Sequence, residues 1–590
     1  MAAKLDAIIT AGLKPDFFAE FGLVSISRTV LVAALSLLVL VGFGLRASHL
    51  GAEGLSEDEL NKLQAVADYR EHGFTSANGE HPLLMKALQT GSIVVADKWN
   101  SIPSLGGRRP VSTESALRFP GIVLGALTAV LIYLVAAELF GAEVGLIAAA
   151  LWAFDPTAIG LNRVAKEDTF LTFFFLLANV FWLRGQRVAE SRPDRRPEKY
   201  YWATAAAFGA MIASKYVPQM IGVSFSYYWM FQRIPETRWR LGKKRLLICV
   251  IFMGATFLAL NPTILLPATW KQMGLFAGQK LVGHDGYEFM GQLYSHRMTD
   301  WLRGTPWYFY EVFMAVKLPL LTVLGFLVGL PLLFRRKLGD GRYLIILWLF
   351  IFTMMFSFAG GKFARYFTVV LPAILITAAI GIQFAGNWIG RKLTPWFYHH
   401  FPTTLYVRSA LALMVVLGSL VAAGGSIPHF RLYTNVLGGG AGNAGFWFPH
   451  DEFYDASMRD AIFAIGKRAQ PGARVASESQ TLCSHYAQRA GRPDLVCVFL
   501  SDPGALQQLR EGDFVIEARG RRYFSNDLVL TTLQQSGEPA FRLSLGETPS
   551  ASVYVMDKKS LEAVVETARR LPPLAKSVHL IPGREVPQSE

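Results

Sequence analysis

Charged residues are scarce in this sequence, and their scarcity excludes an ordinary soluble globular protein. Only 17% of the 590 residues are charged, 52% are hydrophobic and the mean hydropathy is +0.31, whereas a typical soluble domain has about 25% charged residues. Many apolar residues fall in runs near the length of about 20 residues that a helix needs to cross a bilayer. We therefore expect an integral membrane protein.

Cysteine is also rare, with three in the whole chain, which excludes a disulfide-rich scaffold. No Cys and His residues have the spacing of zinc ligands, so we expect no metal site of that kind. Cys249 lies in an apolar run and is expected to be a small buried hydrophobe. Cys483 and Cys497 lie where an oxidising compartment would permit a disulfide, and the sequence leaves that bond open.

The first apolar run, from about Thr29 to Leu45, lacks a following signal-peptide cleavage pattern. A small-residue cleavage site would mark a removed leader, so we expect a retained anchor, preceded by an amphipathic stretch from Leu13 to Phe21. No internal repeat recurs at a fixed period, which argues against a solenoid.

Further apolar segments follow, and with the first they predict about eleven transmembrane helices. These segments lie near residues 117–139, 143–160, 168–184, 200–214, 216–232, 245–266, 307–334, 343–359, 366–386 and 407–425. Basic residues gather in the alternate loops 184–199, 233–245 and 335–342, as they do in short cytoplasmic loops. The pattern predicts a cytoplasmic N-terminus, and an odd number of spans then places the chain after residue 425 on the other side.

The net charge of +14 is explained by this topology. A nucleic-acid-binding protein would gather its positive charge on one soluble face, whereas here most of it lies in short loops between spans. Nucleic acid is therefore not an expected partner.

The chain divides into two expected parts. Residues 1–426 are predicted to form the transmembrane module, with outer loops 47–116 and 267–306, and residues 427–590 a linker and an extracytoplasmic domain. Within the second part, Tyr454 to Ala469 is predicted to be helical. Strands are predicted at 474–477, 496–500 and 552–556, so the domain is expected to be a soluble α/β domain. The glycine-rich stretch from Gly438 to Gly442 is interpreted as a hinge or an ordered loop.

Unusual polar residues follow the first span, beginning with Asp58 and Glu59. Carboxylates are favoured at helix N-termini by about 0.3–1 kcal/mol, so these acids are also explained as the start of a helix from Leu60 to Tyr69. Farther along, Glu80, His81 and Lys86 lie beside the apolar stretch 83–95, which is equally typical of a helix on the membrane surface.

A second polar cluster interrupts apolar sequence between the third and fourth predicted spans. It contains Arg163, Lys166, Glu167 and Asp168. Ionisable residues at a span boundary are costly when they face lipid and are often functional when they face a bundle interior. A solvated tight turn is the alternative.

The outer loop 267–306 mixes aromatic residues with charged ones, including His284, Asp285, Glu288, His296 and Arg297. An aromatic belt at the membrane interface would explain the aromatic residues. Alternatively, a loop that covers a site would explain why aromatic and charged residues occur together. We expect the loop to cover the site. A metal site from the two histidines lacks recognised spacing.

Several short motifs, taken in order, resemble the GT-C class of membrane glycosyltransferases over roughly residues 25–385. They are Asp58-Glu59, Glu80-His81-Pro82, Arg118-Phe119-Pro120, Arg163 to Asp168, Ser214-Lys215-Tyr216, and Arg365-Tyr366 before Leu371-Pro372. The nearest families in this resemblance are the protein O-mannosyltransferases of family 39 and the lipid A aminoarabinose transferases. The sugar-binding repeats of eukaryotic O-mannosyltransferases are missing, so the resemblance is to a bacterial-type member.

The donor sugar stays open between mannose and aminoarabinose. The mannosyltransferase pattern His-Pro-Pro-Leu-Gly-Lys is represented here by residues 81–86, which read His-Pro-Leu-Leu-Met-Lys. The aminoarabinose family has Lys at the position of His81.

The resemblance implies that a sugar, first of all mannose, is transferred with inversion from a polyprenyl-phosphate donor to a hydroxyl of protein Ser/Thr or of a lipid. A general base can contribute about 10² to 10⁴ in rate. Asp58 is the predicted base, Glu59 the alternative base, and Asp168 the residue that holds the acceptor. The predicted substrate-binding residues are Glu80, His81, Lys86, Arg163, Lys215, Lys362, Arg365 and Tyr366.

For Lys362 and Arg365, snorkelling to the membrane interface is an equal alternative. No metal and no cofactor beyond the lipid-linked donor is expected, because fixed cations can stabilise a phosphate leaving group. The expected location is the inner membrane, with the site on the non-cytoplasmic face. A transporter would instead carry charge at the bilayer midplane, and a scaffold would not need acids and bases that converge at the membrane surface.

Overall fold

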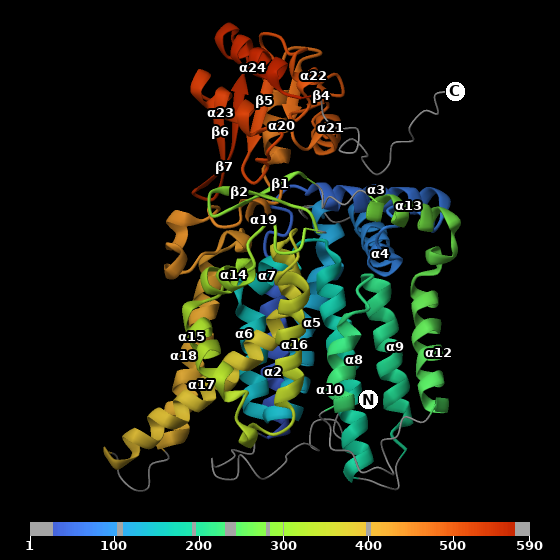
Figure 1. Ribbon diagram of the computed structural model, residues 1–590, viewed down its shortest axis with the longest axis vertical. Coiled ribbons are helices and arrows are strands. Elements are labelled where there is room, and N and C mark those ends of the chain that lie inside the picture. The colour runs from blue at the N-terminus through green and yellow to red at the C-terminus, as the bar shows by residue number, and fades with distance from the viewer. Residues whose placement is uncertain are drawn as a thin grey trace.

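The fold is described from a computed structural model, in which residues 27–102, 110–191, 196–230, 243–278, 284–298, 300–396 and 403–572 are placed. Figure 1 shows a bundle of helices with a small sheet domain beyond one end. The amphipathic stretch predicted at 13–21 and the basic loop residues at 192–195 and 233–240 lie outside the described residues.

Each apolar segment predicted from the sequence contains a helix. The bundle helices are α2 (Arg28–Ala47), α5 (Thr113–Phe140), α6 (Ala142–Phe154), α7 (Pro156–Asn162), α8 (Glu167–Ser191), α9 (Glu198–Ser214), α10 (Met220–Met230), α12 (Lys243–Leu260), α14 (Phe309–Lys317), α15 (Leu320–Leu332), α16 (Arg342–Phe352), α17 (Leu371–Leu393) and α18 (Thr403–Gly425).

The chain is a helical membrane protein. Within the described ranges, four helices are long and apolar enough to cross a bilayer singly, or five if α6 and α7 form one broken span. The four are α2, α5, α17 and α18. Several other bundle helices are shorter, so the number of about eleven spans stays a prediction.

Three predicted spans are broken at proline, where the sequence reading expected continuous helices. In the segment predicted at 245–266, α12 ends at Leu260 and a 3-10 turn begins at Pro262. The segment predicted at 143–160 divides into α6 and α7, which meet at an angle of 60°. The segment predicted at 307–334 divides into α14 and α15 on either side of Leu318 and Pro319. Proline has no N–H for the helical ladder and clashes with the preceding turn, so each helix ends just before it.

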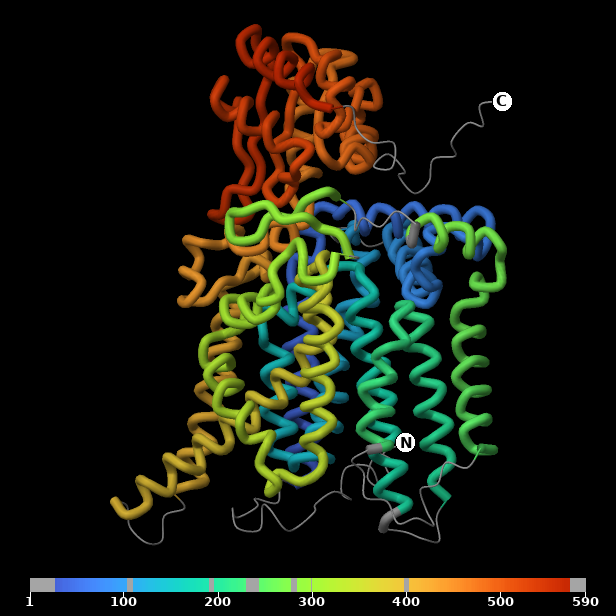
Figure 2. Tube along the Cα trace, viewed as in Figure 1, coloured from blue at the N-terminus to red at the C-terminus, as the bar shows by residue number. Residues whose placement is uncertain are grey.

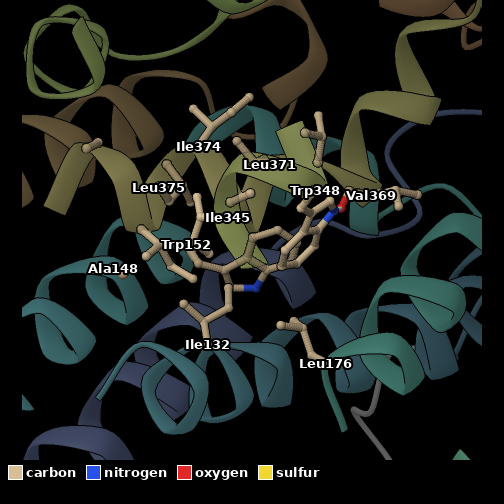
Figure 3. Packing of buried hydrophobic residues seen from close by; sticks show 14 of the residues in the cluster. Ile132, Ala148, Trp152, Leu176, Ile345, Trp348, Val369, Leu371, Ile374 and Leu375 are labelled. Atoms are coloured by element: carbon tan, nitrogen blue, oxygen red, sulfur yellow. Dashed lines mark hydrogen bonds between the residues drawn. The ribbon is translucent and has the colours of Figure 1, made fainter. Parts of the chain in front are cut away.

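The bundle is held together by a tightly packed apolar core. Figure 3 shows Trp152 of α6 and Trp348 of α16 among aliphatic side chains from neighbouring helices. The Trp348 indole N–H donates to the Val369 carbonyl at 3.0 Å, and the Trp152 N–H donates to the Gly125 carbonyl at 2.7 Å. Both indoles are therefore buried without an unpaired donor, and their bonds fix α6 against α5 and α16 against the segment that precedes α17.

Short elements cover the end of the bundle that faces the sheet domain (Figures 1 and 2). They are α3 (Glu57–His72), α4 (Leu83–Asn100), η2 (Pro262–Leu265), α13 (Pro267–Gly278), the hairpin β1 (Gly286–Phe289) and β2 (Gln292–Ser295), and the 3-10 turn η5 (Ala364–Val369) before α17. The helices predicted at 60–69 and 83–95 are confirmed within α3 and α4. The predicted span 366–386 begins later, because η5 occupies its first residues.

The C-terminal part contains a five-stranded sheet in the order β4-β3-β5-β7-β6. Its strands are β3 (Arg474–Ser477), β4 (Val496–Phe499), β5 (Phe514–Ala518), β6 (Phe541–Leu545) and β7 (Thr548–Val555). Strands β3, β4 and β5 are parallel, and β7 is antiparallel to β5 and β6. The helices are α19 (Pro449–Phe453), α20 (Met458–Gly466), α21 (Gln480–Arg489), α22 (Pro503–Leu506), α23 (Asp527–Ser536) and α24 (Lys558–Arg570).

The three strands predicted from the sequence are present, and two more, β5 and β6, were not predicted. The helix predicted from Tyr454 to Ala469 is wrong at its start, because Tyr454 and Asp455 have positive φ angles of 48° and 60° and α20 begins only at Met458. Cys483 and Cys497 form a disulfide between α21 and β4.

The glycine-rich stretch is a held loop and not a free hinge. The Asn435 side chain accepts hydrogen bonds from the backbone N–H groups of Leu437 and Gly438 at 2.9 and 3.2 Å. The Trp447 indole donates to the Gly438 carbonyl at 2.8 Å. These bonds fix the connection between α18 and the sheet domain.

Candidate active site

The first turn of α3 places Asp58 at the junction of the bundle and the sheet domain. Ser56 caps this helix by accepting from the Glu59 N–H at 3.2 Å, and the Glu59 carboxylate accepts from the Ser56 N–H at 3.0 Å. This reciprocal capping box fixes the start of the helix. The alternative explanation of the acids, that they start the helix, is therefore confirmed for Glu59. The Asp58 side chain instead contacts other elements.

Three groups from three separate segments meet the Asp58 carboxylate. Its Oδ2 lies 2.8 Å from Lys166 Nζ and 3.7 Å from Arg365 Nη1, and it accepts a hydrogen bond from the Tyr454 hydroxyl at 2.7 Å. Burial raises the pKa of Asp58, but Lys166 and Arg365 outweigh it and hold the pKa well below the usual range. The carboxylate is therefore ionised at neutral pH.

Glu59 faces the opposite way and is fully engaged. Arg118 of α5 forms two parallel hydrogen bonds to its carboxylate, at 2.8 and 2.7 Å, and the Ala165 N–H donates to the same group at 2.9 Å. The Glu59 side chain is 1% exposed. Through these contacts Glu59 joins α3 to α5 and to the turn before α8.

Asp168 forms an ion pair with Lys215, near the ion pair of Asp58 with Lys166. Lys215, at the end of α9, lies 2.5 Å from Asp168 Oδ1 and 4.5 Å from the centre of the Tyr366 ring. Arg365 lies 5.5 Å from the same ring, so both cations lie near Tyr366. The other oxygen of Asp168, Oδ2, is buried without a hydrogen-bond partner among the described residues.

Glu80 and His81 lie at the edge of this cluster. His81 Nδ1 is 3.6 Å from Glu167 Oε1, which also pairs with Lys62 of α3 at 2.9 Å. Burial lowers the pKa of His81 well below its usual range, so the imidazole is neutral. Glu80 accepts a hydrogen bond from Asn78 at 2.6 Å. His81 thus lies within reach of the charged network, whereas Glu80 holds its own loop.

Three predicted substrate-binding cations use their hydrogen bonds on backbone carbonyls. Lys86 donates to the carbonyls of residues 77, 78 and 81, Arg163 to those of residues 45, 46, 48 and 49, and Lys362 to those of residues 305 and 359. Lysine has three N–H donors, so Lys86 is saturated. Contact of these three side chains with a donor phosphate stays a prediction. Such contact would require breaking the hydrogen bonds that hold the loops of the site.

The hairpin of the outer loop and its flanks contact the sheet domain and the segment around Lys362, and the covering of the site by this loop stays a prediction. His284 stacks on Tyr523 of the sheet domain at 4.1 Å, and its Nε2 accepts a hydrogen bond from Arg521 Nη1 at 2.7 Å. His296 bonds to the backbone of Lys362 at 2.8 Å. The two histidines have different partners, and in the described ranges no three His, Cys, Asp or Glu residues form a possible metal site.

Sequence reasoning missed the contributions of Lys62, Lys166 and Tyr454 to the site. Lys166 was included in the second polar cluster, but no role was predicted for it. Lys62 follows Asp58 by one helical turn, and this spacing could have indicated that the two side chains lie on the same face of the helix. Nothing in the local sequence marked Tyr454, because only the packing of the sheet domain on α3 brings it to Asp58.

Residues 111–270 match the family model described as dolichyl-phosphate-mannose-protein mannosyltransferase. The matched segment contains Arg118, Arg163, Asp168 and Lys215, and it excludes Asp58 and Arg365. No curated protein matches the chain in sequence.

Solved structures similar to this chain include an ArnT protein from Cupriavidus metallidurans bound to undecaprenyl phosphate, at 13% identity and a TM-score of 0.47, covering 90% of this chain and 98% of that one. An oligosaccharyltransferase from Archaeoglobus fulgidus is 11% identical with a TM-score of 0.47, covering 83% and 69%. A protein O-mannosyltransferase complex from S. cerevisiae, bound to the sugar donor, is 19% identical with a TM-score of 0.31, covering 45% and 36%.

These TM-scores are too low to indicate function. The family match and the residues of the site are the evidence for function. The family match covers three of the motifs on which the resemblance was based, those that begin at Arg118, Arg163 and Ser214. The chain is thereby shown to resemble the GT-C class of membrane glycosyltransferases.

Proposed function

We propose that this protein transfers a sugar from a polyprenyl-phosphate donor to an acceptor hydroxyl on the non-cytoplasmic face of the membrane, with inversion at the anomeric carbon. Mannose is the first candidate sugar, and a protein Ser/Thr or a lipid is the candidate acceptor. The observation that carries the proposal is the ionised Asp58 carboxylate, held by Lys166 and Arg365 beside the second pair, Asp168 and Lys215.

Asp58 suits the role of the general base. An acceptor hydroxyl is a poor nucleophile until its proton is taken as the new bond forms, and a positioned carboxylate can contribute about 10² to 10⁴ in rate. The Asp58 side chain is 35% exposed, in contrast to 1% for Glu59. Asp58 can therefore meet an acceptor, whereas Glu59, the alternative base, is enclosed by Arg118.

Asp168 suits the role of holding the acceptor. Only one of its carboxylate oxygens is paired, with Lys215, and the other has capacity to accept a hydrogen bond from a hydroxyl. Lys166, which pairs with Asp58, stands two residues before Asp168 in the sequence, so the start of α8 brings the two carboxylates into one region.

Arg365 and Lys215 suit the leaving phosphate. Negative charge develops on the phosphate as the glycosidic bond breaks, and fixed cations aimed at that position stabilise it. Arg365 makes one long hydrogen bond among the described residues, to the Tyr454 hydroxyl at 3.5 Å, so most of its N–H donors remain for a phosphate. Because these cations are fixed, we propose that transfer needs no metal ion.

A groove beside Lys215 suits the lipid chain of the donor. It has a volume of about 710 Å³, and its lining includes Tyr216, Phe257, Leu265, Trp270 and Met273. Leu265 and Trp270 are 70% and 60% exposed, as expected for apolar side chains that face lipid. Tyr216, which lines the groove, directly follows Lys215, so a lipid lying in the groove would bring its phosphate toward the cations of the site.

The test is transfer of radiolabelled mannose from polyprenyl-phosphate mannose by the purified protein, with peptide and lipid extracts as acceptors. Wild type is compared with Asp58→Asn, which keeps the shape and removes the base, and both are assayed with and without EDTA. EDTA-resistant transfer that Asp58→Asn abolishes supports the proposal. Transfer that survives the substitution moves the base to Glu59 or Asp168.

The alternative donor is aminoarabinose, which the departure at residues 81–86 keeps open. The same assay with polyprenyl-phosphate aminoarabinose and a lipid acceptor distinguishes the two sugars. If neither donor is consumed, the glycosyltransferase proposal fails and a transporter becomes the leading alternative.

A further inference from the structure

The C-terminal part of the chain contributes a side chain to the candidate site, although its sheet lies beyond the end of the bundle (Figure 2). Tyr454, directly after α19, donates its hydroxyl proton to Asp58 Oδ2 at 2.7 Å. Its ring is 8% exposed, and its hydroxyl also lies 3.5 Å from Arg365 Nη1. One phenol therefore touches both the proposed base and the proposed phosphate-binding cation.

We propose that Tyr454 is a positioning residue for sugar transfer: its hydroxyl fixes the Asp58 carboxylate in the orientation that takes the acceptor proton. The inference rests on the proposed function and deepens it, because it makes the C-terminal part a component of the active site. The site is then incomplete in the bundle alone.

The backbone at Tyr454 supports this role. Tyr454 and Asp455 both have positive φ angles, 48° and 60°, which is a conformation that bulky residues rarely adopt. Such strain persists only when surrounding contacts enforce it, and it is often found at functional sites. These two residues end α19 before α20 begins, and in this conformation the phenol meets Asp58.

The contacts of Asp455 enforce that conformation. Its carboxylate forms a two-point ion pair with Nε and Nη2 of the Arg521 guanidinium and accepts the Glu57 N–H at 3.1 Å. Arg521 Nη1 also lies 3.2 Å from Glu57 Oε2. The residue after Tyr454 is thus anchored to the residue before Asp58, which fixes the two side chains relative to each other.

The residues before Tyr454 are anchored as firmly. Glu452 pairs with Lys317 of α14 at 2.6 Å, and both side chains are at most 3% exposed. Arg431, whose guanidinium lies 5.7 Å from the Tyr454 ring, pairs with Glu53 at 2.6 Å. Buried charged pairs of this kind are costly to separate, so the segment is held on the bundle from both sides.

The test measures kcat and KM for the lipid-linked donor in wild type, Tyr454→Phe and Asp58→Asn. A matched control is Tyr554→Phe, which removes a tyrosine hydroxyl that bonds to Glu517 within the sheet domain at 3.2 Å. Loss of a hydrogen bond to a charged group should lower kcat of Tyr454→Phe by about tenfold, with KM for the donor unchanged and Tyr554→Phe equal to wild type. A merely structural role would lower the amount of folded protein and leave kcat per folded molecule intact.

The melting temperatures of Tyr454→Phe, Asp58→Asn and the double variant test the contact without any assay of transfer. A double variant that loses less than the sum of the two single losses supports the contact, and additive losses overturn it. Active wild type with an unaffected kcat in Tyr454→Phe overturns the positioning role and leaves the proposed function standing. Wild type that transfers neither sugar overturns the proposed function, and the role of Tyr454 with it.

Discussion

Arg118 and Glu59 form a bidentate ion pair inside the protein, with N–O distances of 2.8 and 2.7 Å. The remaining N–H groups of Arg118 donate to the carbonyls of Leu50, Glu53 and Gly54, between α2 and α3. The pair thus connects α5 to the turn that presents Asp58.

Replacement of Arg118 by Met should lower the free energy of unfolding by about 3–5 kcal/mol, because it leaves the Glu59 carboxylate buried without its partner. Chemical unfolding of the purified protein in detergent measures the loss. Arg542→Met is the matched control, since Arg542 pairs with Glu538 on the surface, where the side chains are 63% and 89% exposed. Equal stability of the two variants would contradict the role given to the buried pair.

The rate of transfer should fall as the pH rises through about 8. Burial lowers the pKa of Lys166 to about 8, although Asp58 opposes that effect. A lysine is charged below its pKa, so above this pH the ammonium that holds Asp58 is lost. Lys166→Arg keeps its charge throughout this range, and a pH profile of kcat should lose the alkaline limb in that variant. An identical limb in Lys166→Arg would assign the titration to another group.

Arg365→Met should weaken the binding of undecaprenyl phosphate, which carries the phosphate and lipid chain without a sugar. A charged hydrogen bond contributes about 1.5–3 kcal/mol, so Kd should rise roughly tenfold to a hundredfold in calorimetric titrations. Arg336→Met is the control, because Arg336 is exposed in the turn from α15 to α16, at the far end of the bundle. The same Kd in both variants would exclude Arg365 from phosphate binding.

Removal of the disulfide should destabilise the sheet domain more than the bundle. The bond joins Cys483 and Cys497 across a sequence separation of 14 residues, and closure of a loop of about 15 residues is worth about 3 kcal/mol. In the double variant Cys483→Ser with Cys497→Ser, limited proteolysis should cut first within residues 474–555. Unchanged proteolysis would show that the sheet is stable without the bond. Cys249→Ser tests whether a lone thiol change has any effect.

Much of the fold could be predicted from the sequence because it depends on local patterns of apolar and polar residues. Apolar runs identified every bundle helix, since length and hydropathy decide whether a segment can enter a bilayer. The breaks at Pro156 and Pro319 were missed, although proline marks them and a charged residue, Asp155 or Lys317, lies close by, because the surrounding runs are otherwise mostly apolar. In the sheet domain, β5 and β6 were missed because short strands give a weak periodic signal.

The chemistry of the site was only partly predictable. The sequence identified Asp58, Asp168, Lys215 and Arg365 as unusual charges near one face, and the structure brings all four into one connected cluster. It could not distinguish the cations that face the site from Lys86, Arg163 and Lys362, which hold backbone carbonyls. A residue type gives charge, and only the fold decides which partner that charge meets.

By itself, then, the sequence determined that the chain enters a membrane, where its helices lie, and which segments carry charge outside the apolar runs, because these properties depend on neighbours in the chain. The tertiary structure alone decided that Glu59 is enclosed by Arg118 while Asp58 meets Lys166, and that Tyr454 reaches the same carboxylate. These contacts join residues far apart in the chain, and they form only when packing of the bundle and the sheet domain brings their segments together.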